Sequence, residues 1–293
     1  MGFLSGSALV ILGGMTALYF SPRSIKRWFI FSMFDRMDKT TPAPRSYAKQ
    51  VLPHSDLEQL YNNLWIVRGT LPKGGPSLPR AMVIYKLPGT SQLLVHSVIC
   101  VREDTVKQIE ALGTVAYILV PNRGHRLNAN AWAQRYPEAK VICPSFAREK
   151  IELRVLVDHN CEELMEEYPQ EKLPGVSYMR IADERLELVY ILKLEGAKDP
   201  EATAFLSNDI FFNIDPKTAA FVTRLIGSAS GFGMTKLGIL LADDLPSLKK
   251  WIATLPDAAA KMKLDCILVG HGDPVIGASN VIASLRIAAN RLK

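Results

Sequence analysis

The stretch Leu268-Val-Gly-His-Gly-Asp-Pro-Val275 places a histidine directly after a run of apolar residues. The run at residues 266–269 is typical of a buried strand, so His271 is expected at its tip. Gly272 has no side chain to crowd its neighbour, which leaves the His271 ring free to point into a shared site. The sequence therefore predicts a site at the end of this strand, to which other loops contribute.

The composition is that of a globular protein, but its positive charge gathers at one end. The 293 residues are 48% hydrophobic and 22% charged, with a net charge of +6. Residues 1–50 hold seven basic and two acidic side chains, so the rest of the chain is nearly neutral. A membrane surface accounts for this distribution better than nucleic acid does, and we expect no nucleic-acid partner.

The four cysteines lack the spacing of a metal-binding pair. Cys100, Cys143 and Cys266 lie in apolar, strand-like runs, where a free thiol behaves as a small buried side chain. Free thiols fit a reducing compartment.

Residues 3–20 contain no charge and, as a helix, would extend about 27 Å, close to the thickness of a bilayer core. Arg23, Lys26, Arg27 and Trp28 follow at once, as expected at a membrane interface. We therefore predict a single-pass transmembrane anchor at 1–22, a basic interfacial segment and linker at 23–51, and one domain at 52–293. The domain is expected on the cytoplasm-like side of a membrane, for example an organelle inner membrane such as the mitochondrial one. A cleaved targeting peptide and a buried core helix are the alternatives.

Strands and helices alternate along residues 52–293. Strands are predicted at 64–67, 81–87, 93–98, 115–120, 140–143, 176–181, 186–194, 202–206 and 265–269. Helices are predicted at 103–112, 129–135, 245–263 with a break near Pro256, and 279–292. The glycine-rich residues 227–233 lack a phosphate-loop pattern and are expected to form a mobile loop. The order indicates an α/β (α+β) fold of two sheets between helices.

Three loops that each follow a strand carry a candidate ligand: His125, Asp209 and His271. Two imidazoles and a carboxylate form a donor set for zinc with an open position, or for ferrous iron. Each residue also has a structural interpretation. His271 can cap a strand end, Asp209 can pair with a nearby arginine, and His125 can be a solvated loop histidine.

These segments resemble the metallo-β-lactamase fold over about residues 64–293. Pro121-Asn-Arg-Gly-His125 precedes a helix ending at Tyr136-Pro137, Asn208-Asp209-Ile-Phe resembles the later Gly-Asp motif, and His271-Gly272 resembles the final His-Gly. The resemblance implies a four-layer αββα sandwich. In that family, one metal site uses the aspartate of the first motif, its last histidine, the bridging aspartate and the final histidine. His125, Asp209 and His271 match the last three of these.

The departures from the family pattern affect both metal sites. The first two histidine positions of the first motif, which belong to the other site, correspond to Val120 and Asn122. The aspartate position, which belongs to the site of His125 and orients the nucleophile in the family, corresponds to Gly124. A further histidine is missing from residues 194–202. The resemblance therefore implies at most one metal ion, and no two-metal hydrolase.

Two functions follow. The first is a non-catalytic accessory or assembly subunit of a membrane complex, built on a degenerate metal site and needing no cofactor. The second is a hydrolase with one zinc or iron ion, acting on an ester, thioester or lactone. A small-ligand or lipid-binding module is a third.

Overall fold

The structure is a computed structural model that describes residues 22–40, 46–71, 78–167, 171–182, 187–220, 223–224 and 227–292. The chain divides into two compact units, Met1–Ala43 and Pro44–Lys293, and the first contains helix α2 (Arg23–Thr40). The predicted span at residues 3–20 lies outside the described residues, as does most of the linker at 40–45. No helix in the described part of the chain is long and apolar enough to cross a membrane.

The second unit contains a seven-stranded sheet whose strands lie side by side in chain order. Its first four strands pair antiparallel, and the fourth to seventh pair parallel. The strands are β1 (Glu58–Tyr61), β2 (Leu64–Thr70), β3 (Pro79–Lys86), β4 (Gln92–His96), β5 (Thr114–Leu119), β6 (Lys140–Cys143) and β7 (His159–Asn160). Parallel strands need crossover connections. Helices supply these here: α3 (Glu103–Leu112), α4 (Ala129–Arg135) and α5 (Arg148–Glu152), with α6 (Cys161–Glu167) after the last strand.

A five-stranded sheet has the order β15-β13-β10-β9-β8. Its strands are β8 (Val176–Arg180), β9 (Leu188–Lys193), β10 (Thr203–Leu206), β13 (Leu264–Leu268) and β15 (Val275–Ile276). A small third sheet joins β11 (Phe212–Ile214), β12 (Gly231–Gly233) and β14 (His271–Gly272). The helices of this half are α8 (Lys236–Leu241), α9 (Leu245–Lys261) and α10 (Ala278–Asn290).

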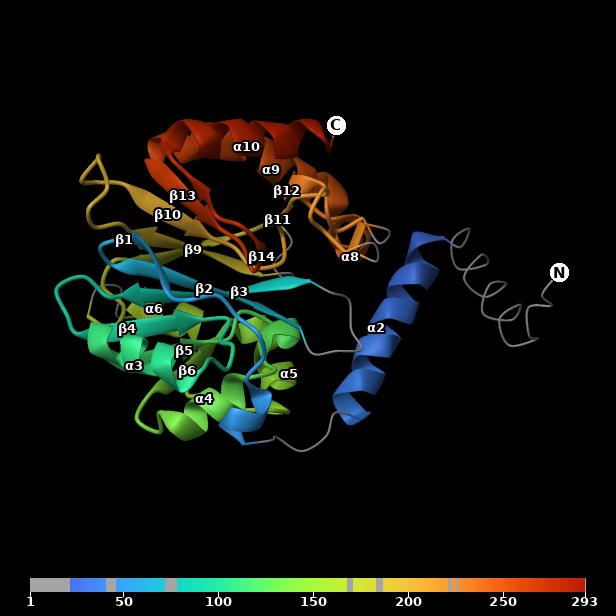
Figure 1. Cartoon of the computed structure of the whole chain (residues 1–293). Coiled ribbons are helices and arrows are strands. Elements are labelled where there is room, and N and C mark those ends of the chain that lie inside the picture. Colours follow the sequence, from blue (N-terminus) through green and yellow to red (C-terminus); the bar gives the residue numbers. More distant parts are fainter. Residues whose placement is uncertain are drawn as a thin grey trace. The chain divides into compact units, whose positions relative to one another are not determined.

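Alternation along the strands sorts apolar side chains onto the two faces of each large sheet. In β2, Trp65 and Val67 share a core with α3 and α4, whereas Leu64 and Ile66 share one with the five-stranded sheet. Val189 of β9 packs in the third core, with α9 and α10. Three cores thus separate four layers in the order helices, sheet, sheet, helices (Figure 1). This arrangement agrees with the predicted αββα sandwich.

Two local expectations were wrong. Helix α9 continues through Pro256, where a break was predicted. The proline removes one backbone donor, but Leu255, Pro256 and Ala259 are buried, so packing on the sheet and on α10 keeps the helix together. The glycine-rich segment at 227–233 is not loop throughout, because its last three residues form β12 and pair with β11.

Candidate metal centre

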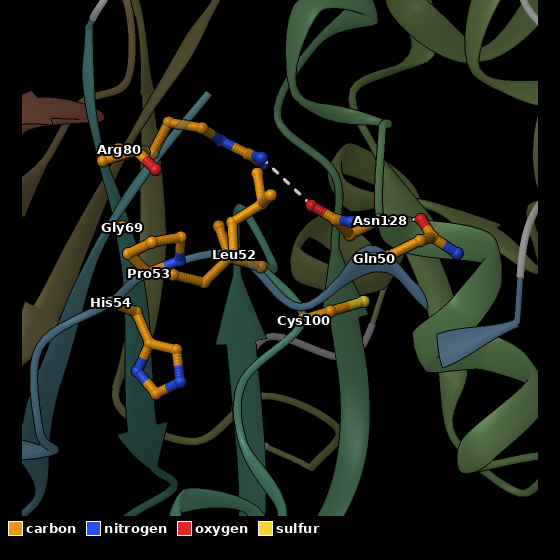
Figure 2. A pocket seen from close by; sticks show the side chains of 10 residues that line it. Gln50, Leu52, Pro53, His54, Gly69, Arg80, Cys100 and Asn128 are labelled. Atoms are coloured by element: carbon orange, nitrogen blue, oxygen red, sulfur yellow. Dashed lines mark hydrogen bonds between the residues drawn. The ribbon is translucent and has the colours of Figure 1, made fainter. Parts of the chain in front are cut away.

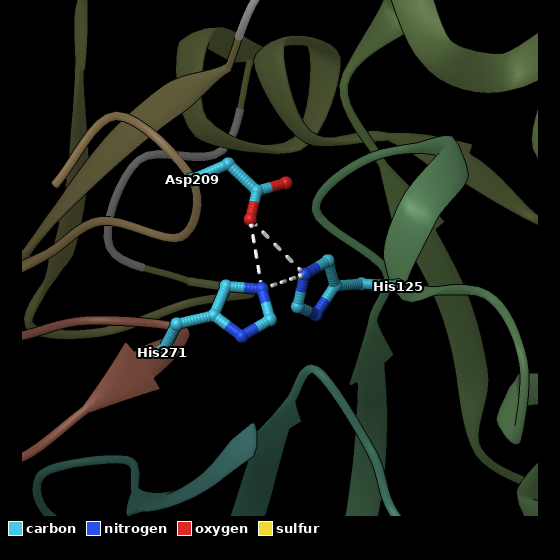
Figure 3. Close-up of side chains that lie close together, drawn as sticks. All are labelled: His125, Asp209 and His271. Carbon is cyan, nitrogen blue, oxygen red and sulfur yellow. Dashed lines mark hydrogen bonds and ion pairs between the residues drawn. The ribbon is translucent and has the colours of Figure 1, made fainter. Parts of the chain in front are cut away.

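The three predicted ligands meet at one end of the sandwich, although they are far apart in sequence. His125 ends a short 3-10 turn (Arg123–His125) after β5. Asp209 follows β10, and His271 begins β14 just after β13. The carboxyl ends of these strands bring the three loops together (Figure 3).

Close backbone packing places the His271 ring. Gly272 has a φ of 114°, and a Cβ there would lie 2.0 Å from the Asn213 carbonyl oxygen. Only glycine therefore allows β14 to lie against β11 in this register. The Phe212 ring, directly opposite on β11, lies 4.4 Å from the His271 ring between centroids. This contact limits how far the imidazole can rotate.

Three donor atoms form a nearly equilateral triangle. The Nε2 atoms of His125 and His271 lie 3.2 Å apart, and each lies 3.2 Å from Oδ1 of Asp209 (Figure 3). The two histidine side chains are 5% and 7% exposed, whereas that of Asp209 is 39% exposed. The triangle is therefore buried on the histidine side and open to solvent beside the carboxylate.

The other ring nitrogen of each histidine is held by a separate partner. His271 Nδ1 donates to the Pro79 carbonyl at 2.7 Å. His125 Nδ1 lies 2.7 Å from the Ser97 hydroxyl, and Ser97 has a φ of 55°, an uncommon conformation for this residue type. Such partners fix the ring orientation of metal-binding histidines. Here they turn both Nε2 atoms inward.

Asp209 is held from its backbone and from its second oxygen. Asn122 donates its amide to Oδ2 at 2.6 Å. The carboxylate of Glu187 accepts the backbone N–H groups of Asn208, Asp209 and Ile210 at 3.0, 2.5 and 3.2 Å. Glu187 is fully buried, and this burial raises its pKa to about 8, although the three donors oppose the shift.

The charges of the triad suit a cation. Burial alone would raise the pKa of Asp209, but the neighbouring His125 and His271 hold it well below its ordinary value. Burial lowers the pKa of His125, against the pull of the Asp209 carboxylate. The site is thus an ionised carboxylate beside a buried imidazole that favours its neutral form.

The carbonyl contact also fixes what the second nitrogen of His271 can do. A carbonyl oxygen only accepts, so Nδ1 of His271 carries a proton. Nε2 therefore faces Asp209 Oδ1 at 3.2 Å either with a second proton, which it donates, or with a lone pair that can bind a metal ion.

The donor geometry fits a metal ion. In a tetrahedral zinc site with bonds of about 2.0–2.1 Å, ligand atoms lie about 3.3 Å apart. The observed 3.2 Å separations agree with that value without any movement of side chains. His125, Asp209 and His271 are also the one group of three or more metal-ligating side chains that converge among the described residues.

The three positions where the sequence departs from the motif offer no ligand. Val120 lies in the apolar core, Asn122 donates to Asp209, and Gly124 has no side chain. The Asn122 amide donates to Oδ2, the oxygen of Asp209 that does not take part in the triangle. The structural interpretation of His125 as a solvated loop residue is wrong, since it is 4% exposed.

Several residues around the triad escaped the sequence analysis. Ser97, Pro79 and Glu187 have no motif of their own, and they lie near the ligands only in the folded chain. Glu187 left one signal, a charge between the apolar residues Leu186 and Leu188 of a predicted strand. All four cysteines are free and buried, which was predicted for Cys100, Cys143 and Cys266 but not for Cys161.

A small pocket lies on the helix-covered side of β3 (Figure 2). Its cavity volume is about 10 Å³, and its lining includes Arg80, His54, Cys100 and Asn128. No member of the triad lines it.

No protein-family model matches the sequence. No curated protein matches it either. Solved structures do match, all at low identity. Two structures of the DIM-1 metallo-β-lactamase, one of them exposed to ceftazidime, share 8% and 7% identity, with TM-scores of 0.52 and 0.53. They align with 83% of this chain and with 100% and 99% of their own. A metallo-β-lactamase from Erythrobacter litoralis shares 14% identity over 84% of this chain and 100% of its own, with a TM-score of 0.47. The chain therefore has a metallo-β-lactamase-like fold, as the sequence resemblance predicted.

Proposed function

We propose that this protein is a hydrolase with a single metal ion held by His125, Asp209 and His271. The observation that carries the proposal is the triangle of donor atoms at 3.2 Å, in which both histidines are fixed from behind. Oriented imidazoles with a carboxylate and one open side are the pattern of a catalytic rather than a structural zinc site. Zinc is the preferred ion, and ferrous iron is the alternative with the same ligands.

When bound, such an ion supplies a Lewis acid and a water of lowered pKa. The chain itself orients the three ligand side chains and leaves one side of the centre open to solvent. Ser97 and Pro79 hold the two rings, and Asn122 and Glu187 hold Asp209. Because only the Asp209 side is exposed, a substrate reaches the centre from that side.

The substrate class is proposed from the fold. Structures similar to this chain are described as metallo-β-lactamases, which supports attack on an acyl bond. We propose an ester, thioester or lactone as the substrate, because each has an acyl group that a bound metal ion would polarise.

The first test is the metal content of the full chain, purified without chelator and without metal-affinity resin. We expect about one zinc or iron ion per chain, and its loss in the His125→Ala and His271→Ala variants. His159→Ala is the matched control, since His159 is exposed and lies outside the centre. Metal-bearing protein is then assayed against ester, thioester and lactone substrates, and His271→Ala should lose turnover.

A wild-type chain that stays metal-free even after loading with zinc would contradict the proposal. Equal metal content in His271→Ala and His159→Ala would do the same, because the ion would then lie elsewhere.

The second candidate is an accessory or assembly subunit of a membrane complex. The observation that favours it is Asn122, which fills the second oxygen of Asp209 where the family places another ion. Stoichiometric copurification with other membrane subunits, together with intact copurification of the His125→Ala variant, would select this function. A monodisperse free monomer from gently solubilised membranes would exclude it.

We also propose that residues 1–22 anchor the protein in a membrane and that α2 lies in the interface. Ile25, Trp28 and Phe29 of α2 are 49%, 70% and 48% exposed, between basic residues. Exposed aromatic and basic side chains are typical of the headgroup region. The full chain should resist carbonate extraction from membranes, and Leu12→Arg should release it; extraction of the wild type would contradict the anchor.

A further inference from the structure

Two consecutive residues at the start of β3 are connected to the two histidines: Pro79 directly to His271, and Arg80 to the segments that place His125. The Pro79 carbonyl accepts the Nδ1 proton of His271 at 2.7 Å. The next residue, Arg80, donates from Nη1 to Asn128 Oδ1 at 3.0 Å and from Nη2 to the Val98 carbonyl at 3.1 Å. Figure 2 shows the first of these Arg80 contacts.

The acceptors of Arg80 lie on the two segments that place His125. Val98 directly follows Ser97, whose hydroxyl lies 2.7 Å from His125 Nδ1. Asn128 lies three residues after His125, at the cap of α4. One planar guanidinium therefore spans both segments, and its fork fixes their separation.

The position of Arg80 is costly and needs an explanation. Its side chain is 2% exposed, and no carboxylate of the described residues forms an ion pair with it. A buried cation that meets only neutral acceptors is expensive to desolvate. Burial lowers the pKa of Arg80 to about 10, so it remains charged at neutral pH.

A purely structural role is the competing explanation for Arg80. The chain offers a second arginine with similar hydrogen bonds for comparison. Arg148 donates from Nη1 to Asn160 Oδ1 at 3.3 Å and from Nη2 to the Val157 carbonyl at 2.8 Å. It also pairs with Glu152 at 2.9 Å and is 34% exposed. A guanidinium with the same two types of acceptor thus also occurs away from the triad. Arg148 can therefore serve as a control for the loss of such a fork.

We infer that Arg80 is a positioning residue of the candidate metal centre, which together with Pro79 sets both histidines from one strand end. This inference rests on the proposed metal site. Arg80 does not touch the triad in the contacts described above, and it acts through Val98 and Asn128.

The test measures the zinc dissociation constant of the full chain by competition with a chromophoric chelator. Arg80→Lys keeps the charge and removes the fork. We expect it to weaken zinc binding by about tenfold, the lower end of the range for direct partners of metal ligands, because Arg80 acts one contact further away. Arg148→Lys, with an equivalent fork elsewhere, should bind zinc like the wild type. The melting temperature of each metal-free variant reports any general loss of stability.

Two comparisons decide the inference. Zinc affinity of Arg80→Lys within twofold of Arg148→Lys overturns it. Arg80→Met removes charge and fork together, so its difference from Arg80→Lys measures the effect of the lysine's positive charge on zinc binding. If Arg80→Met bound zinc as tightly as the wild type while Arg80→Lys did not, the defect would be a misplaced charge and the inference would fail.

Failure of the metal proposal itself is recognised separately. If the wild type binds no zinc, the ring nitrogen resonances of ¹⁵N-histidine report the orientation of His125 and His271 directly. Both sets should then change in Arg80→Lys and not in Arg148→Lys. Unchanged resonances would overturn the positioning role whatever the metal content.

Discussion

His125 and His96 are almost equally buried at the same end of the sandwich, yet their surroundings are opposite. Their side chains belong to neighbouring segments, since His96 ends β4 and pairs with Leu119 at the end of β5. His125 has a polar partner at both ring nitrogens. His96 is 1% exposed and has a hydrogen-bond partner at neither nitrogen. Its ring packs edge-on against Tyr190 at 6.2 Å.

The difference shows that burial alone does not mark a functional histidine. Burial lowers the pKa of His96 to about 3, so this ring behaves as a neutral core side chain. His125 is equally desolvated, but it lies in a set of donors that all point at one place. Convergence of partners, rather than depth, separates the two.

The largest expected effect is on metal binding. His271→Ala should lose the bound ion completely, because two donors remain of three. His96→Ala should keep it, because this ring is not among the converging donors. Elemental mass spectrometry of both variants checks the comparison. Loss of the ion in His96→Ala would show that the two histidines are not functionally distinct.

The next effect concerns acid stability. The unfolded chain binds a proton on His96 below pH about 6.5, whereas the folded chain resists protonation down to about pH 3. The stability that depends on neutral His96 is therefore present above pH 6.5 and lost as pH falls, at up to about 1.4 kcal/mol per unit.

Replacing His96 by leucine should remove this loss. We expect His96→Leu to be more stable than the wild type by roughly 2–3 kcal/mol at pH 4.5, with a much smaller difference at pH 8. Urea unfolding of metal-free protein at the two pH values measures it. An equal difference at both values would show that His96 does not titrate on unfolding.

A smaller effect should follow loss of the Ser97 hydroxyl. Ser97→Gly relieves the positive φ and removes the partner of His125 Nδ1, so zinc affinity should fall by about tenfold. Ser97→Ala should show the same loss of affinity but keep the backbone strain of the wild type, about 1 kcal/mol relative to Ser97→Gly. Zinc competition and thermal unfolding separate the two contributions. Unchanged zinc affinity in Ser97→Gly would show that the Ser97 hydroxyl is not required to orient His125.

The smallest effect is expected at an ion pair outside the site. Asp56 and Arg102 lie 3.1 Å apart, but their side chains are 93% and 45% exposed. Asp56→Ala should change the free energy of unfolding by no more than about 0.5 kcal/mol and leave zinc binding unchanged. This variant is the control for substitutions outside the site. A larger change would contradict the expectation that this exposed ion pair contributes little to stability.

The helices and strands that form the layers could be predicted in large part, because each has an apolar periodicity of its own in the sequence. The helices at 103–112 and 129–135 and the strand at 140–143 match α3, α4 and β6 to the residue. Strands β1 and β7 were missed, because Glu58–Tyr61 is half exposed and His159–Asn160 is only two residues long. The break at Pro256 was wrong because tertiary packing outweighed a local helix rule.

The site could be predicted only in part for a different reason. His125, Asp209 and His271 each follow a strand, so their position was visible in the sequence. Their supports come from elsewhere in the chain: Pro79 lies 192 residues from His271, and Ser97 lies 28 residues from His125. The Pro79 contact depends on how separate sheets pack, and the Ser97 contact depends on the register of β4 beside β5. A residue pattern encodes neither.

The three ligands come from both sheets of the sandwich. His125 belongs to the connection between β5 and β6, while Asp209 and His271 follow β10 and β13 of the opposite sheet. A cation held by all three is a cross-link between the two halves, and it stabilises the folded state by an amount that grows with the logarithm of its free concentration. The lifetime of the protein against proteolysis would then follow the metal supply of its compartment. A chain that folds without the ion would persist longer where the ion is abundant.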